Sequence, residues 1–269
     1  LKEAGKKGVN LDQFDYYDYQ LKGDKVKKYT DLIAESKNSV SIPVIASINC
    51  VYSHEWMSFA KQLEQAGADA LELNMFFLPS DFERTSEEKE KAYFEIIEKV
   101  QKQIGIPIAL KISYYFSNLG PMIQKLSETG IAGLVLFNRF YSPDFDIDKL
   151  EVVSSNVFSN PSDLAISLRW IAIMAERVGC DLAASTGVHD GNALVKQILA
   201  GANAVQVVSA LYKEGKGTIF TMLKTLEKWM EKKGFDSLSD FRGKMSQAKS
   251  SNPAGYERVQ FMRYFGGVN

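Results

Sequence analysis

Short apolar segments alternate with longer amphipathic segments along most of the chain. The apolar segments are rich in β-branched residues and carry apolar side chains on both faces, which is typical of buried parallel strands. They lie at residues 42–49, 70–76, 106–113, 133–138, 181–186 and 204–211. Segments with helical periodicity lie at residues 55–66, 87–103, 119–129, 161–178, 192–200 and 215–233. The pattern therefore predicts an α/β fold in which strands and helices alternate.

Glycine turns and prolines mark the starts of these strands. Gly67, Gly130 and Gly201 each follow a predicted helix, where glycine suits the left-handed conformation of a helix C-terminus. Pro43 and Pro107 lead into two other strands, at first positions where proline costs no ladder hydrogen bond. Because such junctions recur at nearly constant spacing, we expect a closed TIM (β/α)8 barrel rather than an open doubly wound sheet.

The number of predicted strands is smaller than a complete barrel requires. Such a barrel has eight strands, and six are visible here, while residues 1–40 show only one predicted helix, from about residue 24 to 36. We therefore expect two further βα units, of about 50 to 70 residues, to precede Leu1. Residues 1–269 then form a single, N-terminally incomplete barrel domain, with an open six-stranded sheet as the alternative.

Composition and charge narrow the functional classes. The chain has 32 Lys and Arg against 33 Asp and Glu, so its net charge of −1 gives no general attraction to nucleic acid or to an anionic membrane. Two cysteines, Cys50 and Cys180, are too few for an iron–sulfur cluster or a cysteine-based zinc site. The sequence lacks an apolar run of about 18 residues that would span a bilayer. We expect a cytoplasmic protein.

Polar side chains lie at the carboxyl ends of the predicted strands, where barrels of this kind have their active sites. Lys111 lies in an apolar strand, where an ammonium group is costly unless an anionic or electron-rich ligand meets it. The alternative is contact with solvent or a nearby carboxylate. Asn74 and Asn138 end two other strands, and a carboxamide can pair with the imide-like edge of a flavin or a pyrimidine. Loop capping is the alternative for each asparagine.

The last two predicted strands lead into a candidate phosphate site. Thr186 and Gly187 follow one strand, and Val208 and Ser209 end the next. Backbone N–H groups near a helix N-terminus bind anions, and barrels often bind phosphate after strands seven and eight. His189 is a candidate general base, although we favour a structural, hydrogen-bonded role. We expect His54 to cap a helix and Cys50 to be packed.

Together these residues resemble the FMN-dependent dihydroorotate dehydrogenase family, in particular its soluble class 1 branch. Residues 72–74 are similar to the Glu-Leu-Asn of its strand four, Lys111 to its strand-five lysine and Asn138 to its strand-six asparagine. Thr186-Gly187 corresponds to its phosphate-binding Gly-Gly turn, and Val208-Ser209 to its Gly-Thr after strand eight. Residues 14–17 and 233–244 also resemble class 1 segments.

The resemblance implies a barrel that binds FMN across its strand ends, with Lys111 beside the N1/O2 edge of the ring, where it would stabilise negative charge. Asn74 and Asn138 would hold the pyrimidine substrate and contact the cofactor. In the family reaction, a base removes a proton from C5 of dihydroorotate while hydride passes from C6 to flavin N5, which yields orotate for pyrimidine biosynthesis.

The resemblance also carries expectations about partners. A soluble electron acceptor such as fumarate is our first expectation. An iron–sulfur partner subunit that passes electrons to NAD is the second. Homodimerisation is expected from the resemblance alone.

One segment departs from the family pattern. The family base is a cysteine in class 1 and a serine in class 2, on the loop after strand four, whereas residues 75–79 contain neither. Ser80 is the nearest hydroxyl and becomes the candidate catalytic base, together with Lys111 as the other catalytic residue. The sequence leaves open a dihydroorotate dehydrogenase, an FMN-binding paralogue with another substrate, a non-redox phosphate-binding barrel and a non-catalytic binding barrel.

Overall fold

A computed structural model of the chain describes residues 26–50, 55–139, 142–154 and 157–257. Residues 14–17 and His54, for which the sequence suggested roles, lie outside the described residues. The six predicted strands are all present, although shorter than predicted. They are β1 (Ile45–Ile48), β2 (Ala70–Met75), β3 (Ile108–Ile112), β4 (Gly133–Leu136), β7 (Asp181–Ala184) and β8 (Ala204–Val205), and they follow this order in a six-stranded sheet.

The predicted helices are also present. The helix expected near residue 24 covers residues 26–39 of the described chain. The others are α2 (Glu55–Gln65), α3 (Ser86–Gln101), α4 (Leu119–Ser127), α5 (Leu164–Met174), α6 (Gly191–Ala200) and α8 (Gly217–Lys233), and a 3-10 turn, η1 (Pro161–Asp163), leads into α5. Among the described elements, every step from one strand of the six-stranded sheet to the next passes through at least one helix, as the alternation predicted.

The chain divides into two compact units. Leu1–Glu72 and Glu98–Pro107 belong to the first, and Leu73–Ile97 and Ile108–Asn269 belong to the second. In the first unit, α2 buries Trp56, Ala60 and Leu63 along one face. The unit also contains a buried carboxylate, Glu72, which accepts a hydrogen bond from Ser47 Oγ at 2.8 Å. The prediction that residues 1–269 form one barrel domain stays a prediction.

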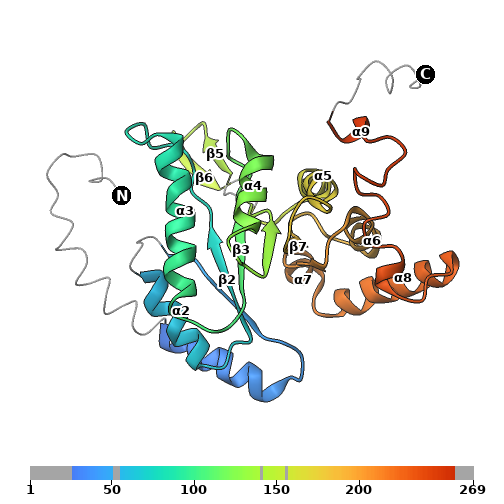
Figure 1. Ribbon diagram of the computed structural model, residues 1–269, viewed down its shortest axis with the longest axis horizontal. Coiled ribbons are helices and arrows are strands. Elements are labelled where there is room, and N and C mark those ends of the chain that lie inside the picture. The colour runs from blue at the N-terminus through green and yellow to red at the C-terminus, as the bar shows by residue number, and fades with distance from the viewer. Residues whose placement is uncertain (1–25, 51–54, 140–141, 155–156, 258–269) are drawn as a thin grey trace, which may run out of the picture. The chain divides into compact units, whose positions relative to one another are not determined.

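The second unit contains the parallel strands that carry most of the candidate chemistry. β3 pairs with β4, β4 with β7 and β7 with β8, all in parallel. All four residues of β4 are buried, as expected of a central strand covered on both faces. Helices α4, α5 and α6 follow one another beside these strands (Figure 1). Because the strands run parallel, their carboxyl ends lie at one edge.

The glycine turns have the geometry that the sequence predicted. Gly67, Gly130 and Gly201 have φ angles of +96°, +80° and +126°, which residues other than glycine rarely adopt. A Cβ on Gly201 would also lie 2.4 Å from the Cβ of Ala175. These turns therefore fix where α2, α4 and α6 end and the following strands begin.

One predicted strand boundary was wrong, and one pair of strands was not predicted. The segment 204–211 is a strand only at Ala204–Val205, and its second half forms the start of helix α7 (Ser209–Glu214), since a run of small and apolar residues fits either structure. The stretch after β4 contains an antiparallel hairpin, β5 (Pro143–Asp146) and β6 (Glu151–Ser154), that we did not predict. Its strands are largely exposed, so they lack the apolar pattern of core strands.

The C-terminal part of the second unit packs on α6 and α8. Phe241 is fully buried, and it stacks with Phe235 at a centroid distance of 5.4 Å and meets Trp229 edge-on at 4.9 Å. The short elements here are η2 (Leu238–Asp240) and α9 (Ala254–Glu257). This aromatic cluster packs against Val195 and Ile198 of α6.

Candidate active site

A pocket of about 220 Å³ lies at the carboxyl ends of β3, β4, β7 and β8. Six of the predicted site residues line it: Lys111, Asn138, Thr186, Gly187, Val208 and Ser209. Four further polar residues that the sequence analysis did not rank as site residues line it too, namely Arg139, Ser159, Ser185 and Gln206. The structure therefore brings residues from four strands, separated by up to about a hundred positions, to one cavity.

Lys111 projects from β3 into this pocket. Its Nζ donates a hydrogen bond to Gln206 Oε1 at 2.7 Å, across the end of the sheet from β8. Among the described residues that line the pocket, Lys111 and Arg139 carry positive charge and none carries a carboxylate. Arg139 pairs with Asp163, and an ammonium group such as that of Lys111 at the end of an apolar strand favours an anionic or electron-rich ligand.

The two asparagines are in direct contact. Asn138 Nδ2 donates to Asn74 Oδ1 at 2.5 Å, and the Asn138 backbone N–H donates to Ile112 O at 2.8 Å. Asn74, on β2, does not itself line the pocket but orients the side chain that does. The contact leaves the Asn138 carboxamide oxygen in the pocket as an acceptor, which is the group that the N–H of an imide edge needs.

The turn after β7 is constrained by its backbone. Thr186 and Gly187 both have positive φ angles, +80° and +75°. A Cβ on Gly187 would lie 2.1 Å from the backbone N of Leu164, at the start of α5, so only glycine fits there. Thr186 Oγ1 donates to Phe137 O at 3.0 Å, so the hydroxyl hydrogen fixes the turn and cannot bind a ligand.

A hydrogen-bonded network holds the start of α7 against the chain that precedes η1. Ser209 Oγ accepts a hydrogen bond from the Ser159 N–H at 3.0 Å, which leaves the Ser209 hydroxyl hydrogen for a ligand. Ser159 Oγ lies 2.9 Å from His189 Nε2, and Lys213 Nζ donates to Ser159 O at 3.2 Å. The hydrogen bond of His189 is of the structural kind that we favoured. Asp190 caps α6 by accepting from the Ala193 N–H at 2.7 Å.

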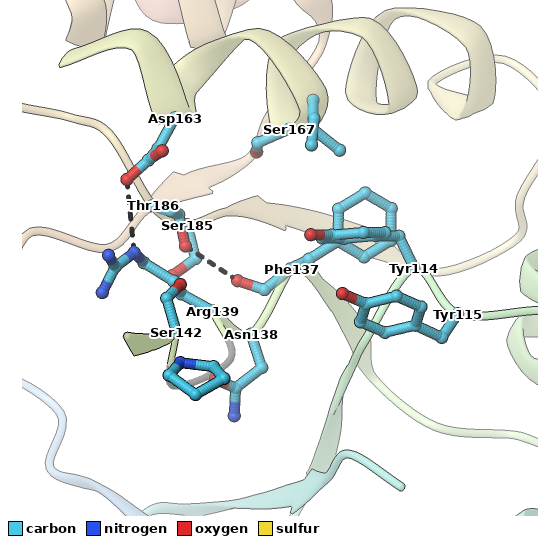
Figure 2. Close-up of a pocket in the computed structure, with 12 residues that line it drawn as sticks. Tyr114, Tyr115, Phe137, Asn138, Arg139, Ser142, Asp163, Ser167, Ser185 and Thr186 are labelled. Carbon is cyan, nitrogen blue, oxygen red and sulfur yellow. Dashed lines mark hydrogen bonds and ion pairs between the residues drawn. The ribbon is translucent and has the colours of Figure 1, made fainter. Parts of the chain in front are cut away.

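A second pocket, of about 290 Å³, adjoins the first and is drawn in Figure 2. The two pockets share Asn138, Arg139, Ser185 and Thr186. On one side of the second pocket, Arg139 Nε pairs with Asp163 Oδ2 at 3.3 Å. Tyr114 and Tyr115 lie on the other side, after β3 (Figure 2). The strand ends therefore offer one continuous polar surface that is longer than either pocket.

The loop after β2 holds the predicted base in a different setting. Ser80 is exposed and is not among the residues of the two pockets described above. Its neighbours Phe77 and Pro79 line a third pocket, of about 380 Å³, together with Tyr93. The Phe77 N–H donates to Tyr93 Oη at 3.4 Å, and burial raises the pKa of Tyr93 to about 12. Phe77 and not Ser80 thus makes the contact with Tyr93, and Lys89 Nζ holds the loop as well by donating to Asp81 O.

Both cysteines lie in settings that are typical of unreactive thiols. Cys50 is buried at the end of β1, in the packed setting that we expected. Burial, with the charge of Asp181 as a second cause, raises the pKa of the Cys180 thiol to about 11, so this thiol stays protonated at neutral pH. Within the described ranges, the side chains form no group of three histidine, cysteine or acidic residues that would hold a metal ion.

Arg139, Ser159 and Gln206 were ranked too low by sequence reasoning, for different reasons. Gln206 directly follows β8, so its position at a strand end was a usable signal. Arg139 directly follows Asn138 near the end of β4, which was a usable signal of the same kind. Ser159 follows the hairpin that was not predicted, and the sequence around it shows no pattern that would have found it.

The donor set of the first pocket fits a flavin nucleotide. Lys111 can meet an electron-rich ring edge, and the Asn138 and Gln206 amides can pair with polar ring atoms. The Ser209 hydroxyl and the backbone of the Gly187 turn are suited to a phosphate. The described residues include no helix that is long and apolar enough to cross a membrane.

Comparisons with known proteins agree with this chemistry. Residues 14–230 match the profile of a family described as dihydroorotate dehydrogenase. The chain is 29% identical over 223 residues to a putative dihydroorotate dehydrogenase A (fumarate) of Aeropyrum pernix, covering 81% of this chain and 72% of that protein. It is 26% identical over 211 residues to the catalytic subunit of dihydroorotate dehydrogenase B (NAD(+)) of Thermoplasma volcanium, covering 75% and 67%. The corresponding catalytic subunit of Pyrococcus furiosus is 26% identical over 215 residues, covering 77% and 70%.

Proposed function

The chain belongs to the dihydroorotate dehydrogenase family, and from this premise we propose that it oxidises dihydroorotate to orotate with FMN as its cofactor. Members of the family are flavin-dependent oxidoreductases that act on the CH–CH bond of dihydroorotate, and their fold is the TIM barrel that the strand and helix alternation predicted. Three points are part of the proposal for this chain: which flavin it binds, which substrate it oxidises and which acceptor it uses.

One observation carries the proposal furthest. Lys111 lies in a pocket that also contains Asn138, and Arg139, which pairs with Asp163 at 3.3 Å, is a second cationic residue of its lining. Such a lining suits a ligand that gains electron density during the reaction, as a flavin does when it accepts hydride. Lys111 would stabilise that charge, while Gln206 keeps the ammonium group oriented through its 2.7 Å hydrogen bond.

The other predicted residues take complementary roles in this proposal. Asn74 and Asn138, joined by their side-chain hydrogen bond, would hold the imide edge of the pyrimidine. The Thr186–Gly187 turn would bind the cofactor phosphate through its backbone, with Ser209 donating its hydroxyl hydrogen and Val208 lining the same wall. Ser80 would remove the proton from the substrate.

We propose fumarate as the electron acceptor and an iron–sulfur partner subunit linked to NAD as the second candidate. The names of the relatives include both kinds of enzyme, a fumarate type in Aeropyrum pernix and NAD(+) catalytic subunits in the others. A cytoplasmic homodimer completes the proposal. Reoxidation of the reduced protein by fumarate, followed through the return of flavin absorbance, tests the first candidate.

The proposal is tested by mixing the FMN-loaded protein with dihydroorotate under anaerobic conditions and following the loss of flavin absorbance. We expect slow reduction, and we expect Ser80→Ala to slow it by a further factor of about 10² to 10⁴, the usual contribution of a general base. Ser86→Ala, a change of the same kind in the exposed first turn of α3, is the matched control. A protein that takes up no FMN on titration would refute the proposal.

A second candidate function is the oxidation of a different substrate by the same cofactor site. The observation that favours it is the loop after β2, where residues 75–79 offer no thiol or hydroxyl side chain and Ser80 is exposed. A protein that binds FMN but is not reduced by dihydroorotate supports this candidate. Rapid reduction that Ser80→Ala leaves unchanged would instead point to another base, with Cys50 and His189 as the next residues to replace.

A further inference from the structure

Thr186 has an unusual backbone conformation in the turn after β7. Its φ angle of +80° lies in the region that favours glycine, and a β-branched residue adopts such an angle rarely and at a cost in free energy. Among the described residues other than glycine, only Leu150, in the exposed β5–β6 hairpin, also has a positive φ angle. Strain of this kind clusters at functional sites. A function of the Thr186 side chain would explain why the turn retains it.

The Thr186 side chain links two neighbouring strands. The backbone hydrogen bonds between β4 and β7 reach Ser185, whose N–H donates to Leu136 O at 3.0 Å. Thr186 Oγ1 continues the series by donating to Phe137 O at 3.0 Å (Figure 2). A side-chain hydrogen bond thus joins the two strands at the point where the chain turns away from β7.

This link fixes the peptide group that precedes the Asn138 side chain. Phe137 O and the Asn138 N–H belong to one planar peptide unit. Thr186 Oγ1 binds the oxygen from the side of β7, and Ile112 O, at the end of β3, accepts from the N–H at 2.8 Å. The peptide unit is therefore held at both ends, and its orientation sets the direction in which the Asn138 side chain leaves the backbone.

Thr186 also connects the two ends of the candidate site. It lines both strand-end pockets, as Asn138 does. It directly precedes Gly187, whose tightly packed turn suits a phosphate. One side chain thus joins the turn at the phosphate end to the strand end that carries Asn138.

We propose that Thr186 is a positioning residue that sets the placement of Asn138 relative to the cofactor turn. The inference rests on the proposed function for the identity of the two ligands, FMN at the turn and the pyrimidine at Asn138. It extends that function by giving a role to a hydroxyl group that itself contacts neither ligand. The link matters because hydride transfer depends on how the substrate is aligned with the flavin ring.

The test measures the affinity for orotate in the full chain saturated with FMN, by flavin absorbance and by calorimetry. Thr186→Val removes the hydroxyl group and keeps the size and β-branching of the side chain. We expect it to weaken orotate binding by about 5- to 10-fold, the effect of one lost hydrogen bond. The same change made in Asn138→Ala should cause no further loss, because the Thr186 hydroxyl acts through Asn138.

Three further variants separate the hydroxyl group from the backbone strain. Thr186→Ser keeps the hydroxyl and should bind orotate more tightly than Thr186→Val. Thr186→Gly relieves the strain but lacks the hydroxyl, so it should bind orotate as weakly as Thr186→Val. Thr221→Val is the matched control, because it removes a hydroxyl that donates to Gly217 O at 3.3 Å on the exposed side of α8, and it should leave both affinities unchanged. Thermal unfolding of each variant checks that the fold is retained.

A merely structural role gives a different result. If Thr186→Val lowers stability or FMN affinity but leaves orotate affinity at saturating FMN unchanged, the hydroxyl only holds the turn and the inference is overturned. Equal losses with and without Asn138 overturn it too. If Thr186→Val fails to fold, the comparison of Thr186→Ser with Thr186→Gly decides in its place.

The same experiment distinguishes failure of the inference from failure of the proposed function. A chain that takes up no FMN overturns the proposed function and this inference with it. A chain that binds FMN but not orotate overturns only the proposed substrate. The effect of Thr186→Val is then measured on FMN affinity with and without Asn138, which lines the flavin pocket. A loss that disappears in Asn138→Ala supports the inference, and an equal loss in both overturns it.

Discussion

The Thr186–Gly187 turn and the loop after β2 both belong to the second unit and both follow a strand, yet the structure constrains them very differently. The turn has two positive φ angles, and a single added methyl group on Gly187 would meet backbone atoms of Asp163 and Leu164. The loop has a run of exposed residues, including Ser80, and Phe82 at its tip is 100% exposed.

This difference shows which part of the proposed site has a fixed shape and which part can vary. A cofactor site built from a backbone turn keeps its shape with few side chains, because the chain itself supplies the donors. A catalytic base on an exposed loop needs one particular side chain at one particular place. The same fold can therefore retain the cofactor while the residue that acts on the substrate changes.

The largest effect is expected from Gly187→Ala. The added Cβ would lie 2.1 Å from Leu164 N in a backbone conformation that alanine adopts only with strain, so the turn must move. We expect a loss of about 3 kcal/mol or more in the free energy of unfolding, together with loss of FMN binding. Urea unfolding and flavin fluorescence measure the two. Gly179→Ala is the matched control, because a Cβ there meets no atom within 4 Å.

Replacing Lys111 should leave the fold intact and affect the reaction. Lys111→Ala removes the cation beside the Gln206 amide without changing the backbone of β3. We expect flavin reduction by substrate to slow by about 10²- to 10³-fold, the usual loss when one group that stabilises developing charge is removed. Anaerobic stopped-flow absorbance gives the rate. Lys125→Ala, on the exposed face of α4, should change nothing, and equal rates in both variants would remove Lys111 from the proposal.

A moderate effect is expected at Tyr93, which helps to anchor the loop after β2. Tyr93 is 2% exposed, packs against Phe77 and Phe116 at centroid distances of 5.2 and 5.4 Å, and has its pKa raised by burial to about 12. Since an unfolded tyrosine has a pKa of about 10, the native state keeps a proton that the unfolded state loses above that pH. The contribution of Tyr93 to stability is therefore complete below about pH 10 and is lost as the pH rises through 12.

Comparison with Tyr93→Phe isolates that contribution. The loss should reach about 2 kcal/mol between pH 10 and 12 in the unchanged protein, following about 1.4 kcal/mol per unit of pKa difference. The variant should lack this part of the pH dependence, and near neutral pH it should lose about 1 kcal/mol with the hydrogen bond from the Phe77 N–H. Urea unfolding at a series of pH values measures both. Parallel pH curves for the two proteins would show that Tyr93 ionises without penalty.

The sequence predicted most of the fold, because the features that determine it are local and repeated. Gly67, Gly130 and Gly201 are needed for positive φ angles at helix ends, and the apolar strands are needed to fill a sheet covered by helices. The boundary of β8 did not follow from these features, since residues 204–211 contain no breaker between the strand and α7.

The candidate site was predictable where a residue lies at a strand end and not elsewhere. Lys111, Asn138 and the Thr186–Gly187 turn follow strands, so the fold alone brings them to one edge. The contact of Ser159 with Ser209 depends on how the chain returns from the β5–β6 hairpin, and short exposed strands leave a weak pattern. Ser80 was chosen by its chemistry and its place in the loop, and neither determines where its hydroxyl lies.

The smallest effect on stability is expected from Phe82→Ser, and it sharpens the contrast with the turn. Phe82 is 100% exposed, so exchanging this large aromatic residue for a small polar one should change the free energy of unfolding by less than about 0.5 kcal/mol and leave FMN binding unchanged. Adding one methyl group to Gly187 should thus cost far more than removing a whole ring from the loop. The rate of flavin reduction by dihydroorotate, measured in the same variant, tests whether Phe82 takes part in the reaction. If that rate changes while stability and FMN binding do not, Phe82 contacts the substrate during the reaction, and the loop determines specificity. A loss of stability would instead show that the loop is packed in solution. The contrast with the turn would then be wrong.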